Sequence, residues 1–175
     1  MKLVDIKHEA LRKKSKKVEK LDKKIKDLIA EMKNTLISQK DPEGVGLAAP
    51  QVGKNLQLFI MHYPEEGLNL KVVMNPKVIN ISKQKVKSKK DENNILEGCL
   101  SLPHYYGPVS RAKDITIEYL NEEGAIITEK FEGFSSHIVQ HEMDHLKGRL
   151  FIDHIFENKS PLYYIQGEDW EEVEL

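Results

Sequence analysis

Residues 140–148 read Gln-His-Glu-Met-Asp-His-Leu-Lys-Gly, and their two histidines, His141 and His145, stand four positions apart. On a helix this spacing places both imidazoles on one face, with Glu142 beside them. Two such imidazoles can hold a metal ion, and the neighbouring carboxylate can accept a proton from water activated there. The stretch therefore predicts a helix that carries part of a hydrolytic metal centre, although short strings of this type also arise by chance on amphipathic helices.

A catalytic centre of the zinc type usually takes three protein ligands and leaves one position for water, so a third ligand is needed. Metzincin peptidases place a histidine where this chain has Phe151, which excludes that subfamily. His154 and Glu157 remain downstream alternatives and would make a metallopeptidase, but the apolar residues around them explain that segment without a metal.

The upstream candidate is Cys99, the only cysteine of the chain, which lies between Gly98 and Pro103 in a segment predicted to be bent. A cysteine thiolate binds metal tightly, whereas many lone cysteines are simply small buried side chains. A closed, non-catalytic metal site is a further alternative, but such a site has no use for the carboxylate of Glu142.

Length and composition favour one soluble domain. The chain has 175 residues, of which 39% are hydrophobic and 31% charged, enough for a single core and unlike a disordered or membrane protein. The first residues lack the apolar run of a signal peptide, and the single cysteine fits a reducing compartment. We therefore expect a cytoplasmic protein, without membrane association.

The net charge of −1 conceals an asymmetry between the two ends. Residues 1–40 contain 13 Lys and Arg against 6 Asp and Glu, whereas residues 151–175 contain 1 against 7. Two solvated faces explain this pattern most simply, and a basic face that touches ribosomal RNA is the alternative. No aromatic residues are interleaved with the lysines, so sequence-specific nucleic-acid binding is not expected.

Hydrophobic periodicity predicts a mixture of helices and strands in one domain. Helical spacing covers 21–39 and 134–147, and a turn is expected at 64–67. Residues 82–94 are expected to form an exposed loop, and helical periodicity ends after Asp153. Strands are predicted at 56–63, 72–81, 115–120, 125–131 and 161–165. The expected fold is α+β, with antiparallel or mixed sheets around the central helix that carries His141 and His145.

Three blocks resemble the signature motifs of the peptide deformylase family, in the order and at the separations typical of that family. They are Gly-Val-Gly-Leu-Ala-Ala-Pro-Gln at 44–51, Glu-Gly-Cys-Leu-Ser at 97–101 and Gln-His-Glu-Met-Asp-His at 140–145. The resemblance implies a metal held by Cys99, His141 and His145, commonly Fe(II), with Zn(II), Ni(II) or Co(II) able to substitute. It also implies removal of the formyl group from N-formylmethionyl nascent peptides.

The resemblance and the chemistry of the residues assign further roles around the metal. The side-chain amide of Gln51 and the backbone N–H of Leu100 are expected to stabilise negative charge on the formyl oxygen. Glu142 is the expected general base and acid. The substrate-binding candidates fall into two groups. Backbone groups for the peptide are expected from Gly44, Val45 and Gly46, and the walls of the pocket are expected to include Val45, Phe134, His137 and Ile138. Glu97, Arg111 and Asp144 are expected to support the ligands, with ordinary salt bridges as the alternative.

Several positions depart from the family pattern. His137 extends the histidine stripe to 137, 141 and 145, so His137 with His141 forms a rival ligand pair; we expect His137 at the pocket rim instead. The Leu11-Arg12 pair lacks its usual preceding proline. Residues 155–175 form an acidic extension in place of the basic helix through which some members dock on the ribosome. Only a transient ribosome contact by another route is therefore expected.

Overall fold

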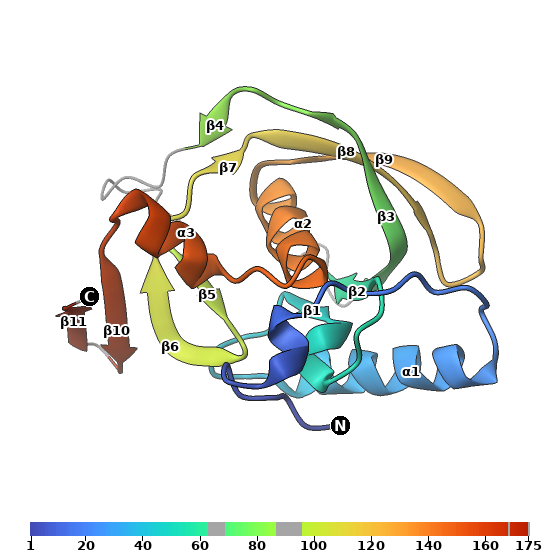
Figure 1. The fold of residues 1–175 in the computed structure, drawn as a ribbon, viewed down its shortest axis with the longest axis horizontal. Helices are drawn as coiled ribbons and strands as arrows, with labels where there is room; N and C mark the ends of the chain where they lie inside the picture. Colours follow the sequence, from blue (N-terminus) through green and yellow to red (C-terminus); the bar gives the residue numbers. More distant parts are fainter. Residues whose placement is uncertain (63–68, 87–95, 168, 175) are drawn as a thin grey trace.

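The computed structural model describes residues 1–62, 69–86, 96–167 and 169–174. Helix α2 (Gly133–Leu146) lies in the middle of the molecule, with long strands curving round it (Figure 1). Its apolar residues Ile138, Val139 and Met143 are buried in a core cluster that also contains Phe59 and Ile117. This packing fixes the orientation of the helix, and therefore of the histidines that it carries.

The larger sheet has five antiparallel strands, in the order β1-β2-β3-β8-β9. These strands are β1 (Gly46–Ala48), β2 (Leu58–Met61), β3 (Lys71–Ile81), β8 (Asp114–Leu120) and β9 (Ile126–Glu132). Helix α1 (Lys23–Ser38) packs against this sheet through Met32 and Leu36, which join a core cluster with Leu47 of β1 and Leu58 of β2. Asp22 caps this helix by accepting a hydrogen bond from the Ile25 N–H.

The smaller sheet has four strands in the order β11-β10-β6-β5, and it carries Cys99. They are β5 (Glu97–Cys99), β6 (Leu102–Gly107), β10 (Leu162–Gln166) and β11 (Asp169–Val173). Helix α3 (Phe151–Asn158) packs on one face through Phe151 and Ile155. Short elements complete the description: the 3-10 helices η1 (Glu9–Arg12) and η2 (Ala49–Val52), and the two-stranded pair β4 (Lys85–Val86) and β7 (Arg111–Ala112).

The structure confirms the predicted α+β class and most of its main elements. The helices at 21–39 and 134–147 correspond to α1 and α2, and the hairpin at 115–131 corresponds to β8 and β9. The strands predicted at 56–63, 72–81 and 161–165 correspond to β2, β3 and β10. No helix among the described residues is long and apolar enough to cross a membrane.

Three expectations were wrong. Helical structure continues past Asp153 because Phe151 and Ile155, four apart, bury one face, and because the Asp153 carboxylate accepts a hydrogen bond from the Leu150 N–H. Residues 85–86 of the expected loop form β4, paired with β7. The acidic end forms β11, an edge strand. The predicted turn at 64–67 and the loop residues 87–94 lie outside the described residues.

Candidate active site

Three buried side chains meet where β5 faces α2. Cys99, His141 and His145 each offer one ligand atom, and these atoms all lie within 4.8 Å of one another. The Cys99 sulfur is 3.3 Å from the Nε2 atom of His145. One thiolate and two imidazoles suit a divalent transition metal such as Fe, Zn, Ni or Co. The donor set and its burial therefore fit the metal that the sequence motifs imply.

The alternative ligands lie elsewhere. The Nε2 atom of His154 is 2.8 Å from the Asp144 carboxylate, and Glu157 is an exposed residue paired with Arg149. Neither belongs to the grouping of Cys99 with the two motif histidines. The geometry thus gives no support to the metallopeptidase alternative.

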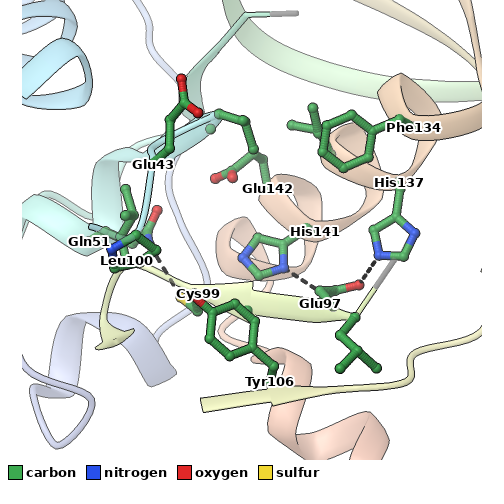
Figure 2. Close-up of a pocket in the computed structure, with 16 residues that line it drawn as sticks. Glu43, Gln51, Glu97, Cys99, Leu100, Tyr106, Phe134, His137, His141 and Glu142 are labelled. Carbon is green, nitrogen blue, oxygen red and sulfur yellow. Dashed lines mark hydrogen bonds and ion pairs between the residues drawn. The ribbon is translucent and has the colours of Figure 1, made fainter. Parts of the chain in front are cut away.

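Glu97 orients His141. One Glu97 oxygen lies 2.6 Å from the Nδ1 atom of His141, which leaves the other ring nitrogen, Nε2, to face the ligand group (Figure 2). Burial would raise the pKa of Glu97, but the charges of Arg111 and His141 hold it well below its usual value. Burial likewise lowers the pKa of His141, but Glu97 raises it well above the usual value. Glu97 therefore favours positive charge at this position, which a metal cation would supply.

The pKa of His145 is shifted in the opposite direction to that of His141. Burial and the neighbouring charge of His141 hold the pKa of His145 well below its usual value. The imidazole is therefore neutral at physiological pH, which is the form that binds a metal. Its Nδ1 atom is buried without a hydrogen-bond partner among the described residues.

Arg111 ties the cysteine strand to the helix. Its guanidinium group contacts Glu97 on β5 at 2.6 and 3.0 Å and Asp144 on α2 at 2.5 Å. Burial would raise the pKa of Asp144, but its bond to His154 and the charge of Arg111 lower it to about 2. Both carboxylates are therefore charged and shared by one buried guanidinium, which is the arrangement expected for a support of the ligands.

Glu142 is 2% exposed and faces the cavity beside His141 (Figure 2). Its Oε2 atom has no hydrogen-bond partner among the described residues. Burial raises the pKa of Glu142 to about 7. A side chain at Gly46 would overlap its Oε1 atom, so the glycine of β1 is what allows Glu142 to lie there.

Gln51 comes to the centre from η2. Its Oε1 atom accepts a hydrogen bond from the Ala48 N–H at 2.8 Å, which fixes the side-chain amide. Its Nε2 atom is therefore directed to the candidate ligands and donates to the sulfur of Cys99 at 3.4 Å. Leu100 follows Cys99 directly and also lines the cavity.

The cavity has a volume of about 300 Å³, and Gln51, Cys99, His141 and Glu142 are among the residues that line it. The substrate-binding candidates Val45, Gly46, Phe134, His137 and Ile138 all line it. Gly44 is not among the lining residues, and its carbonyl oxygen accepts a hydrogen bond from Nε2 of His62 at 2.8 Å. Further lining residues were not predicted from the sequence: Pro42, Glu43, Leu96, Gly98 and Tyr106.

His137 lies in the cavity wall and faces Glu97 (Figure 2). Its Nε2 atom is 2.5 Å from a Glu97 oxygen. The side chain is partly buried and 12% exposed, and it lines the cavity wall. It is directed to the carboxylate that supports His141, and it is not part of the ligand group, so the rival pair of His137 and His141 has no support.

β1 forms one edge of the five-stranded sheet beside the cavity. The Val45 carbonyl accepts a hydrogen bond from the His62 N–H, and Gly46 is the next residue, opposite Met61. Because the groups of an antiparallel strand alternate in direction, Gly46 presents its N–H and C=O to the open edge. An extended peptide can therefore pair with the strand at this point.

Comparisons with known proteins agree with this geometry. Residues 1–160 match the family described as polypeptide deformylase. A peptide deformylase from Pseudothermotoga lettingae is 41% identical over 143 residues, covering 82% of this chain and 75% of the relative. Peptide deformylase 2 from Clostridium acetobutylicum is 42% identical over 149 residues, covering 85% and 91%.

Solved structures give the same result. The Thermotoga maritima peptide deformylase superposes with a TM-score of 0.76 at 35% identity, covering 87% of this chain and 95% of that one. A Synechococcus elongatus peptide deformylase in complex with actinonin gives 0.77 at 33% identity, covering 87% and 77%. The chain belongs to the polypeptide deformylase family.

Proposed function

We propose that this protein removes the formyl group from N-formylmethionyl nascent peptides at the centre formed by Cys99, His141 and His145. The observation that supports this assignment most strongly is the convergence of three ligand atoms within 4.8 Å at the end of a cavity that Glu142 and Gln51 also line. When held by these three side chains, a divalent metal supplies a Lewis acid that polarises the formyl group and activates water.

Glu142 is the proposed general base and acid. It is buried next to the ligand His141, and its Oε2 atom has no partner among the described residues, so it is available for proton transfer. The carboxylate accepts a proton from the attacking water and passes it to the amine nitrogen as the formamide C–N bond breaks. The products are formate and a free amino terminus.

Gln51 and Leu100 are the proposed donors to the formyl oxygen, which gains negative charge as water attacks. The Gln51 amide is already oriented by its bond to the Ala48 N–H, so little reorganisation is needed when the charge develops. The Leu100 N–H belongs to the residue after Cys99 and so lies close to the ligand group.

Recognition of the substrate is proposed to combine backbone pairing with an apolar pocket. The free edge of Gly46 binds the peptide main chain, which explains how proteins of many sequences are accepted. Val45, Phe134 and Ile138 line the cavity and offer apolar surface to the methionine side chain. His137 contributes the polar part of that wall.

Fe(II) is the proposed working metal, with Zn(II), Ni(II) and Co(II) able to replace it, since mixed thiolate and imidazole donors suit all four ions. The proposed location is the cytoplasm, where nascent chains emerge. Contact with the ribosome would be transient and would use the exposed lysines of α1, such as Lys23, Lys24 and Lys26. Co-sedimentation with ribosomes at low and at high salt tests that contact. Protein that stays in the supernatant at low salt would contradict it.

The direct experiment is an assay of protein loaded anaerobically with Fe(II), Ni(II) or Co(II) on formyl-Met-Ala-Ser. We expect formate release, with no cleavage of acetyl-Met-Ala-Ser or of internal peptide bonds. Protein stripped with a chelator should be inactive and should recover when metal is returned. Intact formyl-Met-Ala-Ser in the presence of a full complement of metal would contradict the proposal.

A further inference from the structure

A continuous row of paired residues crosses the smaller sheet from the cavity to the carboxy-terminal hairpin. Gly98 on β5 is opposite Tyr106 on β6, Tyr106 is opposite Tyr163 on β10, and Tyr163 is opposite Glu172 on β11. Directly opposed residues of an antiparallel sheet point to the same face. The face that contains Tyr106 therefore continues onto β10 and β11.

This face begins at the wall of the active-site cavity. Tyr106 lines the cavity, and its ring lies over Gly98, where an added Cβ atom would come within 2.6 Å of the ring. Only glycine at position 98 allows the ring to lie so close to the strand that carries Cys99. A peptide leaving the cavity along this wall would thus meet Tyr106 first.

Beyond Tyr106 the face carries exposed aromatic surface. Tyr163 and Trp170 form an edge-to-face pair with ring centroids 6.2 Å apart, and Trp170 is 59% exposed. The opposite face of the hairpin is covered, because Leu162 and Val173 pack in the cluster beneath α3. One face therefore holds the hairpin to the protein, and the other leaves Trp170 open to solvent.

The hairpin is also strongly acidic. Residues 160–175 contain five Asp and Glu and no Lys or Arg. Glu172 is exposed on the aromatic face, in the same row as Tyr106 and Tyr163. Glu43 also lines the cavity, and burial together with the charge of Asp41 raises the pKa of Tyr106. Acidic groups therefore lie both at the cavity and on the aromatic face of the hairpin.

We propose that the β10–β11 hairpin is a distal binding surface for the substrate chain downstream of formylmethionine, with a preference for basic residues. Trp170 and Tyr163 supply a stacking surface, and Glu172 attracts Lys or Arg. The proposal rests on the proposed function. The hairpin lies beyond residue 160, where the family match ends.

Strand spacing sets the length of peptide that is needed. Neighbouring strands lie about 4.8 Å apart, so β11 is about 10 Å beyond Tyr106. An extended chain advances about 3.3 Å per residue and needs about three residues to cover that distance. Tripeptides should therefore end short of Trp170, whereas peptides of six or more residues should reach it.

The experiment compares kcat/KM for formyl-Met-Ala-Ser, formyl-Met-Ala-Ser-Lys-Lys-Tyr and formyl-Met-Ala-Ser-Glu-Glu-Tyr in the metal-loaded enzyme. We expect the lysine hexapeptide to exceed the tripeptide about tenfold, mainly through KM, and the glutamate hexapeptide to show no gain. Higher salt should reduce the advantage of lysine. The ratio of hexapeptide to tripeptide is the readout, so a change in the fraction of folded enzyme cancels.

Matched variants locate the effect on one face of β11. Trp170→Ala should remove most of the hexapeptide gain, and Glu172→Gln should abolish the difference between lysine and glutamate peptides. Glu171→Gln is the control, because Glu171 lies between them in sequence and points to the opposite face. Equal ratios in the parent and in the Trp170 and Glu172 variants would overturn the distal surface. Absence of formate release from all three peptides would instead overturn the proposed function.

Discussion

The Glu97 carboxylate lies 2.6 Å from the Nδ1 atom of His141, so a residue of the cysteine strand orients a histidine of the central helix. We expect Glu97→Gln to weaken metal binding and activity by about 10- to 100-fold, because the amide is a poorer acceptor and removes a negative charge from the centre. Competition between the protein and a chelator for Co(II) measures the affinity. Glu43→Gln is the control, since Glu43 lines the same cavity but its carboxylate points away from His141 (Figure 2). Unchanged affinity in the Glu97 variant would refute the supporting role.

Gly46 allows Glu142 to occupy its position. Gly46→Ala should reduce kcat by at least about tenfold while the metal content stays at the parent level, since the new methyl group would overlap the Glu142 carboxylate. The double variant with Glu142→Ala tests the cause, because the alanine at 46 should have no further effect once the carboxylate is removed. Additive losses in the double variant would show that Gly46 acts by some other route.

Gln51 is held by the Ala48 N–H, with its Nε2 atom directed to the sulfur of Cys99. Gln51→Ala should lower kcat by about 10²- to 10³-fold, which is the usual cost of losing one donor to a developing negative charge. Metal content and KM should change little. Gln57→Ala, which removes an amide that bonds the Ser15 carbonyl instead, is the matched control. A rise in KM with unchanged kcat would place Gln51 in ground-state binding.

Arg111 is the shared partner of two buried carboxylates. Arg111→Met should lower the free energy of unfolding by about 3 to 5 kcal/mol, because it leaves Glu97 and Asp144 without their guanidinium. Urea unfolding with chelator present measures this without a contribution from bound metal. Lys33→Met breaks the partly exposed pair with Glu122 and should cost less than about 1 kcal/mol. Similar losses in the two variants would contradict the structural importance of Arg111.

Local patterns predicted the parts of the fold that depend on local contacts. The spacing of His141 and His145 belongs to one helix, and α1 and the β8–β9 hairpin each carry their own periodicity. Helix α3 was missed because its eight residues show a buried face only when the smaller sheet is present to cover Phe151 and Ile155. The strands β5, β6 and β7 were also not predicted, since short strands gain stability from remote partners.

In the candidate site, too, motifs were recognisable in the sequence, whereas positions that depend on contacts between remote segments were not. Motif resemblance named Cys99, His141 and His145, and the structure brings them together, although Cys99 and His141 are far apart in sequence. The sequence did not indicate Tyr106, because its place in the cavity depends on the pairing of β6 with Gly98. The tyrosine pair after Pro103 was the one available signal, since aromatic residues favour strands. The approach of His137 to Glu97 likewise depends on another element, because Glu97 lies on β5.

The most direct test of the account is the metal content and formyl-Met-Ala-Ser turnover of Cys99→Ala and Glu142→Gln, prepared anaerobically beside the parent protein. Cys99→Ala should lose both metal and activity, because it removes one of three ligands. Glu142→Gln should keep one metal ion per chain and lose activity by about 10²- to 10⁴-fold, because it removes only the proton-transfer group. Full turnover by Glu142→Gln, or a full metal complement in Cys99→Ala, would contradict the proposed centre.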